Sequence, residues 1–282
     1  MKKVLVAGAT GYLGKHVVKE FKKQGCWVRA LARSSEKLAS IREFIDEIFI
    51  GEVTTLDSLH GICKEIDIVF SSIGITKQKD RLTYMDVDYQ ANKNLLNIAI
   101  KEGVKKFIYV SVFNARRLRH LKIVEAKERF VDELNKSNIE SIVIRPNGFF
   151  SDMTEFFNMA KKGRVYVFGN GNYKGNPIHG VDLAKVCVHS LTSNKQDIDV
   201  GGPEILTQNE IAQMAFDVLN KKPKITHIPG WVRKLSLFLI RTLTPEKTYG
   251  PLEFFMTVLA TDMIAPTYGK HHLQDFFMEI KK

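Results

Sequence analysis

The chain has 282 residues, 44% of them hydrophobic and 26% charged, so it can bury a sizeable core and is unlike a disordered protein. Its net charge is +11, but the lysines are spread over many segments, so we expect a solvated basic surface and no nucleic-acid partner. Three distant cysteines argue against a disulfide framework or a metal site, and no apolar run approaches the roughly 18 residues of a membrane span.

The N-terminal segment predicts a strand, a glycine turn, a helix and a second strand. Residues 2–7 and 27–32 are apolar runs of strand length, and residues 12–23 carry apolar side chains at helical spacing. Three glycines spaced GxxGxxG join the first strand to the helix. Such a turn lets a diphosphate approach the backbone at the positive end of the helix dipole. We therefore predict a dinucleotide site that includes Gly8, Thr10, Gly11, Tyr12, Leu13 and Gly14. Because the first strand begins near residue 3, we expect no signal peptide and a cytoplasmic protein.

The sequence Ala-Thr-Gly-Tyr-Leu-Gly within this turn resembles the short-chain dehydrogenase/reductase superfamily, in its extended or atypical branches. The resemblance implies a Rossmann-type, doubly wound parallel α/β sheet. An acidic residue after the second strand would favour NAD(H), because it accepts bonds from the adenosine ribose. Here Arg33 and Ser34 follow that strand, and a guanidinium suits a 2′-phosphate. We favour NADP(H); the alternative is that Arg33 is an ordinary surface residue.

Further strands and helices alternate along the chain. Strands are expected at residues 45–50, 66–70, 106–112 and 141–144, and helices at residues 56–64, 95–100 and 124–134. Glu52 and Val53 follow the third strand, where the resembling family often has an Asp-Val pair near the adenine. Small residues after the fourth strand leave room for a ligand at the sheet edge: Ser71, Ser72, Ile73 and Gly74. Asp88 and Asn92 share a helix face, and the family pattern implies a supporting role for Asn92 beside the cofactor. The alternative is that both are ordinary polar residues on the surface.

The predicted helix at residues 124–134 departs from the active-site pattern of the superfamily. Its usual Tyr-x-x-x-Lys places a phenol and an ammonium on one face, so that the cation lowers the phenol pKa for proton transfer to a carbonyl. Lys127 fits the lysine, but Ile123 stands where the tyrosine would be. Ser111, after the fifth strand, occupies the place of the catalytic serine or threonine. We predict Lys127 and Ser111 as catalytic residues; the other candidate acids are Tyr84, Tyr109 and His120.

The same loss of tyrosine occurs in the NmrA-like and isoflavone-reductase-like atypical members that this helix resembles. In some of those relatives the lysine itself is the acid/base, and others are nucleotide sensors without chemistry. We therefore expect an NADP(H)-dependent reductase or dehydrogenase acting on a small, apolar substrate. One alternative is a non-catalytic nucleotide sensor or assembly protein. A second is a nucleotide-sugar epimerase, although the missing tyrosine argues against it.

Two further segments match patterns of the same family. Arg-Pro-Asn-Gly-Phe-Phe follows the sixth strand and implies that Pro146 and Asn147 flank the nicotinamide, with backbone groups left free where the proline ends strand pairing. Residues 176–184 match a Pro-Ile-His-x-x-Asp-Leu-Ala pattern, in which we expect Asp182 to cap a helix starting at Leu183 and His179 to be structural. Further on, Thr207 and Glu210 predict a capping box.

We expect a dinucleotide-binding core at residues 1–150 and a small α+β substrate lobe at residues 151–282, with residues about 176–202 returning to the core. Residues 231–243 are apolar with interspersed arginine and lysine. Such a helix either packs onto the substrate lobe, which we favour, or lies on a membrane surface. The oligomeric state is not indicated.

Overall fold

The computed structural model describes residues 1–75 and 82–282, which fall into two compact units. The first unit consists of Met1–Arg145 and Leu183–Ile198, and the second of Pro146–Asp182 and Asp199–Lys282. The second segment of the first unit is the part of the chain that returns after residue 182.

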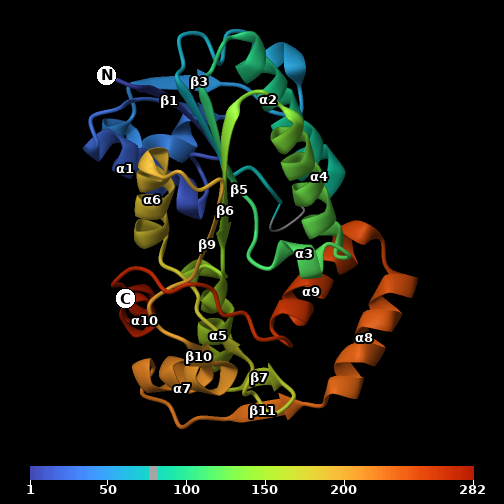
Figure 1. The fold of residues 1–282 in the computed structure, drawn as a ribbon. Coiled ribbons are helices and arrows are strands. Elements are labelled where there is room, and N and C mark those ends of the chain that lie inside the picture. Colours follow the sequence, from blue (N-terminus) through green and yellow to red (C-terminus); the bar gives the residue numbers. More distant parts are fainter. Residues whose placement is uncertain (76–81) are drawn as a thin grey trace. The chain divides into compact units, whose positions relative to one another are not determined.

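The first unit is built on a sheet with the strand order β3-β2-β1-β4-β5-β6-β9 (Figure 1). All neighbouring pairs from β3 to β6 are parallel, so the predicted doubly wound parallel sheet is confirmed. The order reverses between β1 and β4, which is where such sheets bind ligands. The strands are β1 Lys3–Ala7, β2 Trp27–Ala32, β3 Glu47–Ile50, β4 Ile68–Ser71, β5 Lys106–Val110, β6 Glu140–Pro146 and β9 Asp197–Val200.

Helices cover both faces of this sheet. Helices α1 (Tyr12–Lys23) and α6 (Gly180–His189) lie on one side, and α2 (Asn92–Lys101) and α4 (Lys122–Lys136) on the other (Figure 1). Helix α1 buries its predicted apolar stripe, and Leu13, Val17 and Phe21 are at most 3% exposed. Short segments complete the unit: the 3₁₀ helices η1 Ser35–Phe44, η2 Leu56–Leu59 and η4 Ser190–Thr192, the π-helix η3 Met85–Ala91, and α3 Ala115–Leu118.

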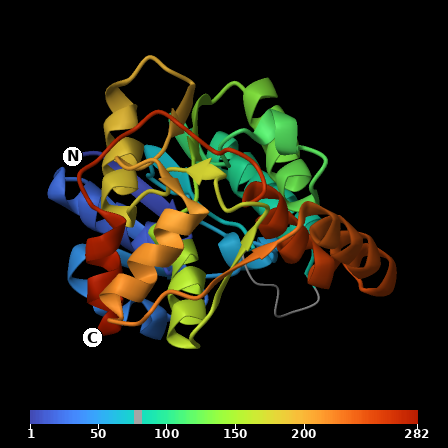
Figure 2. The same cartoon turned by 90° about the horizontal axis from the view of Figure 1, so that it is seen from below.

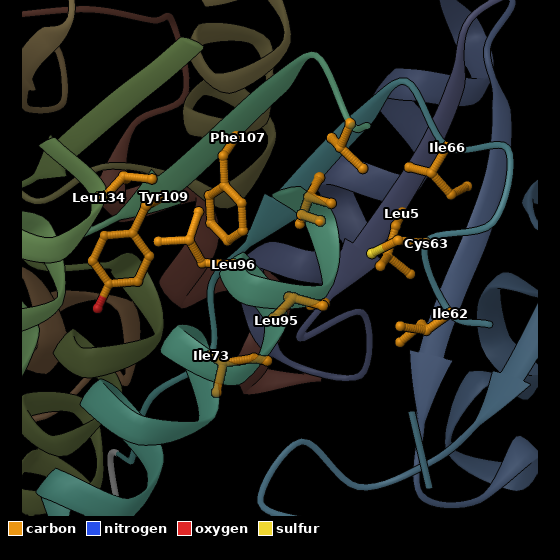
Figure 3. Close-up of a cluster of buried hydrophobic side chains, with 14 of the residues drawn as sticks. Leu5, Ile62, Cys63, Ile66, Ile73, Leu95, Leu96, Phe107, Tyr109 and Leu134 are labelled. Atoms are coloured by element: carbon orange, nitrogen blue, oxygen red, sulfur yellow. The ribbon is translucent and has the colours of Figure 1, made fainter. Parts of the chain in front are cut away.

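One core cluster of the first unit packs between the sheet and the α2/α4 layer (Figure 3). It joins Leu5 of β1 and Phe107 of β5 to Leu95 and Leu96 of α2. Tyr109 belongs to this cluster, with its ring edge-on to Phe130 at 4.6 Å between centroids. The sheet is therefore fixed by apolar packing on the face that also positions α4.

The predicted helix at residues 56–64 is wrong, because only the single 3₁₀ turn η2 forms there. Gly61 and Glu65 adopt left-handed backbone angles, with φ of 78° and 60°, which an α-helix cannot contain. The apolar residues that suggested a helix are buried all the same: Leu59, Ile62 and Cys63 pack into the core from turns.

The second unit holds three helices side by side: α5 (Phe150–Lys161), α7 (Gln208–Val218) and α10 (Leu273–Lys281) (Figure 2). Their shared core is aromatic and includes Phe156, Phe157, Phe216 and Phe277. Strand β7 (Val165–Phe168) pairs in parallel with β11 (Ile225–Ile228), and β8 (Lys174–Gly175) pairs antiparallel with β10 (Leu206–Thr207). Helix α8 (Gly230–Leu243) packs beside α9 (Glu246–Val258).

Two predicted helix starts have different outcomes. The capping box is confirmed, because Thr207 accepts from the Glu210 N–H and Glu210 accepts from the Thr207 N–H. The start at Leu183 is wrong, because α6 begins at Gly180 and Asp182 lies inside its first turn. Asp182 Oδ2 instead accepts bonds from the His271 ring and from the backbone N–H groups of residues 270 and 271. His179 stacks on His271 at 4.4 Å, which is a packing contact.

Candidate dinucleotide-binding site

The turn between β1 and α1 requires its glycines. Gly8 has a φ of 91°, and a Cβ there would lie 2.7 Å from Ser72 Oγ. A Cβ on Gly14 would lie 2.0 Å from the Gly8 carbonyl oxygen, closer than any side chain allows. Gly11 N donates to Gly8 O at 3.0 Å and closes the turn. The glycines therefore bring the ends of β1 and β4 together with the backbone uncovered.

The start of α1 suits an anion. Its N-cap is Gly11, which has no side chain to cap the helix, and no acidic residue lies in its first turn. The first N–H groups and the positive end of the helix dipole therefore face the glycine turn without a competing carboxylate from this helix. A cavity of about 320 Å³ beside the turn is lined by Thr10, Gly11 and Tyr12 and by the basic side chains Lys15 and Lys19.

The predicted adenosine side of the site lies at the carboxyl ends of β2 and β3. Arg33 is exposed after β2, with the half-exposed Ser34 next to it. A guanidinium nitrogen of Arg33 lies 3.6 Å from a carboxylate oxygen of Glu52, which follows β3. Val53 is held by a bond from Asn94 Nδ2 to its carbonyl at 3.2 Å. The cation that we predicted to bind a 2′-phosphate is thus present, but a carboxylate shares its charge.

Asn92 organises the end of β4. Its side chain is fully buried; Oδ1 accepts from Ser71 Oγ at 2.5 Å and Nδ2 donates to the Asp88 carbonyl at 2.9 Å. Nδ2 also lies within bonding distance of the carbonyls of Ile73 and Val87. Asn92 therefore ties the strand end to the π-helix η3, and the supporting role implied by the family pattern agrees with this geometry.

Lys127 lies beside the same strand end. Its ammonium is 2.9 Å from Asp88 Oδ1, with the Lys127 side chain 14% exposed and the Asp88 side chain fully buried. Ile75 N donates to the other Asp88 oxygen at 3.0 Å. A Cβ on Gly74 would lie 2.5 Å from Asp88 Oδ1 and 2.7 Å from Lys127 Nζ, so only glycine leaves room for this pair. The sequence did not indicate that Asp88 and Lys127 meet.

The ion pair fixes the charge of Lys127. Burial is the largest single effect and lowers the pKa of this ammonium, but the combined effects of Asp88 and Tyr109 outweigh it, and the pKa lies above its ordinary value. Burial also disfavours the charged form of Asp88 and therefore raises the pKa of this carboxyl group, while the neighbouring ammonium acts in the opposite direction. Lys127 is therefore an ammonium at neutral pH and a poor proton donor.

The usual phenol is absent from this part of α4. Ile123 lies one turn before Lys127 on the same helix and is buried. Of the other candidate acids, Tyr109 lies beside the lysine, with Nζ 5.7 Å from its ring centroid. Burial raises the pKa of the Tyr109 phenol above its ordinary value. His120 is exposed, with Nδ1 3.1 Å from the Arg117 carbonyl, and Tyr84 is buried.

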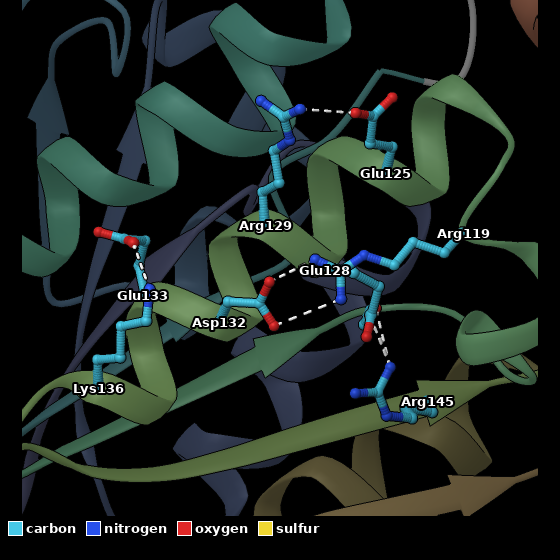
Figure 4. A network of polar contacts seen from close by, with 9 residues as sticks. Arg119, Glu125, Glu128, Arg129, Asp132, Glu133, Lys136 and Arg145 are labelled. Atoms are coloured by element: carbon cyan, nitrogen blue, oxygen red, sulfur yellow. Dashed lines mark hydrogen bonds and ion pairs between the residues drawn. The ribbon is translucent and has the colours of Figure 1, made fainter.

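Ser111 belongs to a different polar cluster. Its hydroxyl donates to Glu128 Oε1 at 2.6 Å. Arg145 Nη1 donates to the same oxygen at 2.7 Å (Figure 4). Arg145 Nε also donates to Asp197 at 2.7 Å. Neighbouring residues of a helix point about 100° apart, so Glu128 and Lys127 leave α4 in different directions. Ser111 and Lys127 thus bond to different partners, and Glu128 is a partner that the sequence did not reveal.

Pro146 and Asn147 lie at the end of β6 and belong to the second unit. The backbone N–H of Asn147 donates to the Val200 carbonyl at 2.8 Å, so our expectation that it is free is wrong. The reason is that β9 continues the sheet beside β6. The Asn147 side chain is also engaged, and donates to Asn176 Oδ1 at 2.8 Å and to the Met263 carbonyl.

Comparisons with known proteins agree with this geometry. A family model described as NAD(P)H-binding matches residues 8–194, more than half of the chain. The photosystem II assembly factor Ycf39 of Guillardia theta is 28% identical over 230 residues, which cover 80% of this chain and 73% of that protein. The chloroplastic divinyl chlorophyllide a 8-vinyl-reductase of Arabidopsis thaliana is 27% identical over 319 aligned residues, covering 98% of this chain and 76% of that protein.

Among solved structures, the NADPH complex of the NADPH-dependent quinone oxidoreductase of Escherichia coli is similar in fold. Its TM-score is 0.69 at 14% sequence identity, and the match covers 100% of both chains. At this identity the likeness concerns the fold alone.

Proposed function

We propose that this chain, which belongs to the NAD(P)H-binding family, is an NADP(H)-dependent reductase or dehydrogenase that moves hydride to or from a small, apolar substrate. The bound cofactor would supply or accept the hydride. The residues of the first unit fit such a dinucleotide, since Gly8 and Gly14 leave the backbone uncovered and Arg33 adds a cation at the adenosine side. The chain's own residues would bind and orient the cofactor and would stabilise the charge that develops during hydride transfer.

The observation that carries the proposal is the buried Lys127–Asp88 pair at the end of β4, with 2.9 Å between Nζ and Oδ1. Asp88 fixes the position and protonation of the ammonium, and the Gly74 backbone packs against both groups. A cation held in a site of low dielectric stabilises negative charge that develops on a substrate oxygen or conjugated carbon. By resemblance, the same ammonium would also hold the nicotinamide ribose.

The absent phenol narrows the substrate class. A simple aldehyde or ketone gains most from an acid that protonates its oxygen as hydride arrives. Ile123 has no proton to give, and Lys127 holds its proton tightly. Quinones and conjugated alkenes delocalise the negative charge that the hydride brings, so their reduction depends less on a proton donor. The name of the Arabidopsis relative indicates reduction of a vinyl group, which supports this class.

A second candidate is a non-catalytic NADP(H)-binding assembly or regulatory protein. Ile123 in place of the phenol favours it, as does the similarity to the Ycf39 assembly factor. In this reading the Lys127–Asp88 pair holds the cofactor without chemistry.

Turnover of NADPH with a panel of quinones, enones and aldehydes distinguishes the reductase from the non-catalytic binding protein. We expect oxidation with a quinone or enone, and a loss of kcat/KM of about 100-fold or more in Lys127→Ala. Lys136→Ala, on the exposed side of the same helix, is the matched control and should behave as wild type. Tight NADPH binding without turnover on any member of the panel would support the assembly or regulatory protein instead.

Ser111→Ala tests the second predicted catalytic residue in the same assay. Because its hydroxyl is bonded to Glu128, we expect stability to fall by about 1–2 kcal/mol while kcat stays within about threefold of wild type. A large loss of kcat with normal stability would instead place the hydroxyl in contact with the substrate.

A further inference from the structure

Helix α8 of the second unit has an apolar face turned outward. Four large side chains on that face are exposed: Trp231 is 67%, Leu235 49%, Phe238 63% and Leu239 44% exposed. Their spacing of four, three and one residues places them on one side of the helix. Surface residues of this size are normally scattered singly, so a contiguous set indicates a contact with something else.

The inner side of α8 accounts for its attachment to the second unit. Leu237 is its buried residue, and Arg241 forms an ion pair with the buried Glu253 of α9. Helices α8 and α9 lie side by side in Figure 2. The helix is therefore held by its partly polar side, while its most apolar side points away from the core of its own unit.

The charge around this face selects the kind of partner. From Lys221 to Lys247 the chain has seven lysines and arginines, of which Arg241 is paired with Glu253 of α9, and Glu246 is the single acidic residue of this segment. Lys234 is exposed on α8, at the border of the apolar face. A second copy of the chain would bring the same positive charge to the contact. An anionic surface is complementary instead.

We propose that α8 docks this protein on an anionic lipid surface, with Leu235, Phe238 and Leu239 inserted below the headgroups, Trp231 at the headgroup level and the basic side chains on the phosphates. A basic helix with Trp, Phe and Leu on its other face is typical of helices that lie in the membrane interface. Fourteen residues are too few to span a bilayer, and within residues 1–75 and 82–282 no helix is long and apolar enough to do so. Trp231 stands at the start of the helix, and its ring suits the headgroup level.

The proposal is independent of the reaction at the dinucleotide site, and sedimentation of the full-length protein with lipid vesicles tests it. Vesicles of phosphatidylcholine with 30% phosphatidylglycerol are compared with pure phosphatidylcholine in low salt and at about 0.5 M salt, where surface charges are screened. We expect binding to the anionic vesicles in low salt, release in high salt, and little binding to neutral vesicles. A blue shift of Trp231 fluorescence, measured in a Trp27→Phe background, should accompany binding.

Variants locate the contact. Phe238→Ser combined with Leu239→Ser should weaken vesicle binding at least about tenfold, because two apolar side chains lose their burial. Lys234→Glu should weaken binding about fivefold or more, from about 1 kcal/mol per basic residue at an anionic surface. Ile205→Ser is the control, since Ile205 is 46% exposed, close to the 44% of Leu239, but lies outside α8. Circular dichroism and thermal unfolding of each variant report whether it is folded.

Three results would overturn the proposal: no binding to anionic vesicles in low salt, equal binding to neutral vesicles, or equal binding by the double serine variant. If light scattering then finds a dimer that the double serine variant disperses, the face joins two copies of the chain. Specific capture of an acidic protein that the same variant abolishes, without vesicle binding, would assign the face to a protein partner.

Discussion

At the scale of single residues, the predicted adenosine side of the candidate site holds one cation and one anion close together. Arg33 alone would favour a 2′-phosphate, whereas Glu52, 3.6 Å away, neutralises part of its charge and would repel that phosphate. Both side chains are exposed to solvent, so their mutual attraction is weak and a bound phosphate can compete for the guanidinium.

We predict that Arg33→Ala weakens NADPH binding about tenfold, the lower end of what a bond to a charged group contributes, with little effect on NADH. Glu52→Gln should strengthen NADPH binding, because it removes the competing charge. Fluorescence titration with both nucleotides in low and moderate salt measures these affinities. Arg129→Ala, on the outer face of α4, is the control. Tighter binding of NADH than of NADPH by wild type would contradict the predicted preference.

The sequence predicted residues for this candidate site but not the groups to which they bond. Lys127 and Ile123 were singled out because they occupy the two positions of the Tyr-x-x-x-Lys pattern of the resembling superfamily, and the glycines because they must follow a strand and open a helix. The partners of Lys127 and Ser111 could not be found in this way. Asp88 reaches Lys127 from another helix, and Arg145 reaches Glu128 from a strand, so only the packed fold brings them together.

At the scale of elements, the buried strands were the most predictable. Strand β2 was expected at residues 27–32 and spans Trp27–Ala32, because a strand covered on both faces is a continuous apolar run. The expected helix at residues 56–64 failed because its apolar residues are buried from turns, where their spacing carries no helical information. The start of α6 was misplaced because Asp182 has the chemistry of a cap but bonds to a distant segment.

The capping box of α7 gives a pH-dependent prediction. The N–H and hydroxyl of Thr207 bond to the Glu210 carboxylate and lower its pKa, and burial opposes this only weakly. A lowered pKa in the folded state means that the stabilisation is present above the ordinary glutamate pKa of about 4.3 and is lost as pH falls through the folded pKa. Glu210→Ala should therefore cost about 0.5–1 kcal/mol at pH 7 and less below pH 4.

Denaturant unfolding of wild type and of Glu210→Ala at pH 7 and at pH 3 measures this difference in stability. Glu210→Gln, which keeps an acceptor that does not titrate, should lose the pH dependence. Glu279→Ala, on the exposed side of α10, serves as the control for a lost surface carboxylate. An equal cost of Glu210→Ala at pH 7 and pH 3 would contradict the role of the ionised carboxylate.

At the scale of the whole molecule, the chain forms two units, and the residues best placed to hold a dinucleotide lie in the first. The glycine turn, Arg33 and Lys127 are all within Met1–Arg145. Our predicted division at residues 150 and 151 stays a prediction about domains, but the position of these groups makes the first unit the part that a dinucleotide should stabilise.

We predict that NADPH at about 100 times its Kd raises the unfolding temperature of the first unit by about 5–10 °C, from a stabilisation of about 2.7 kcal/mol. Gly14→Ala should abolish this shift, because the added Cβ would lie 2.0 Å from the Gly8 carbonyl oxygen, and backbone cannot turn aside as a flexible side chain can. Gly230→Ala is the matched control, since a Cβ there has no neighbour within 4 Å in the described structure. Calorimetry with and without NADPH measures the shift, and if the units unfold separately only one transition should move. A full shift in Gly14→Ala would mean that the dinucleotide is not held by the glycine turn.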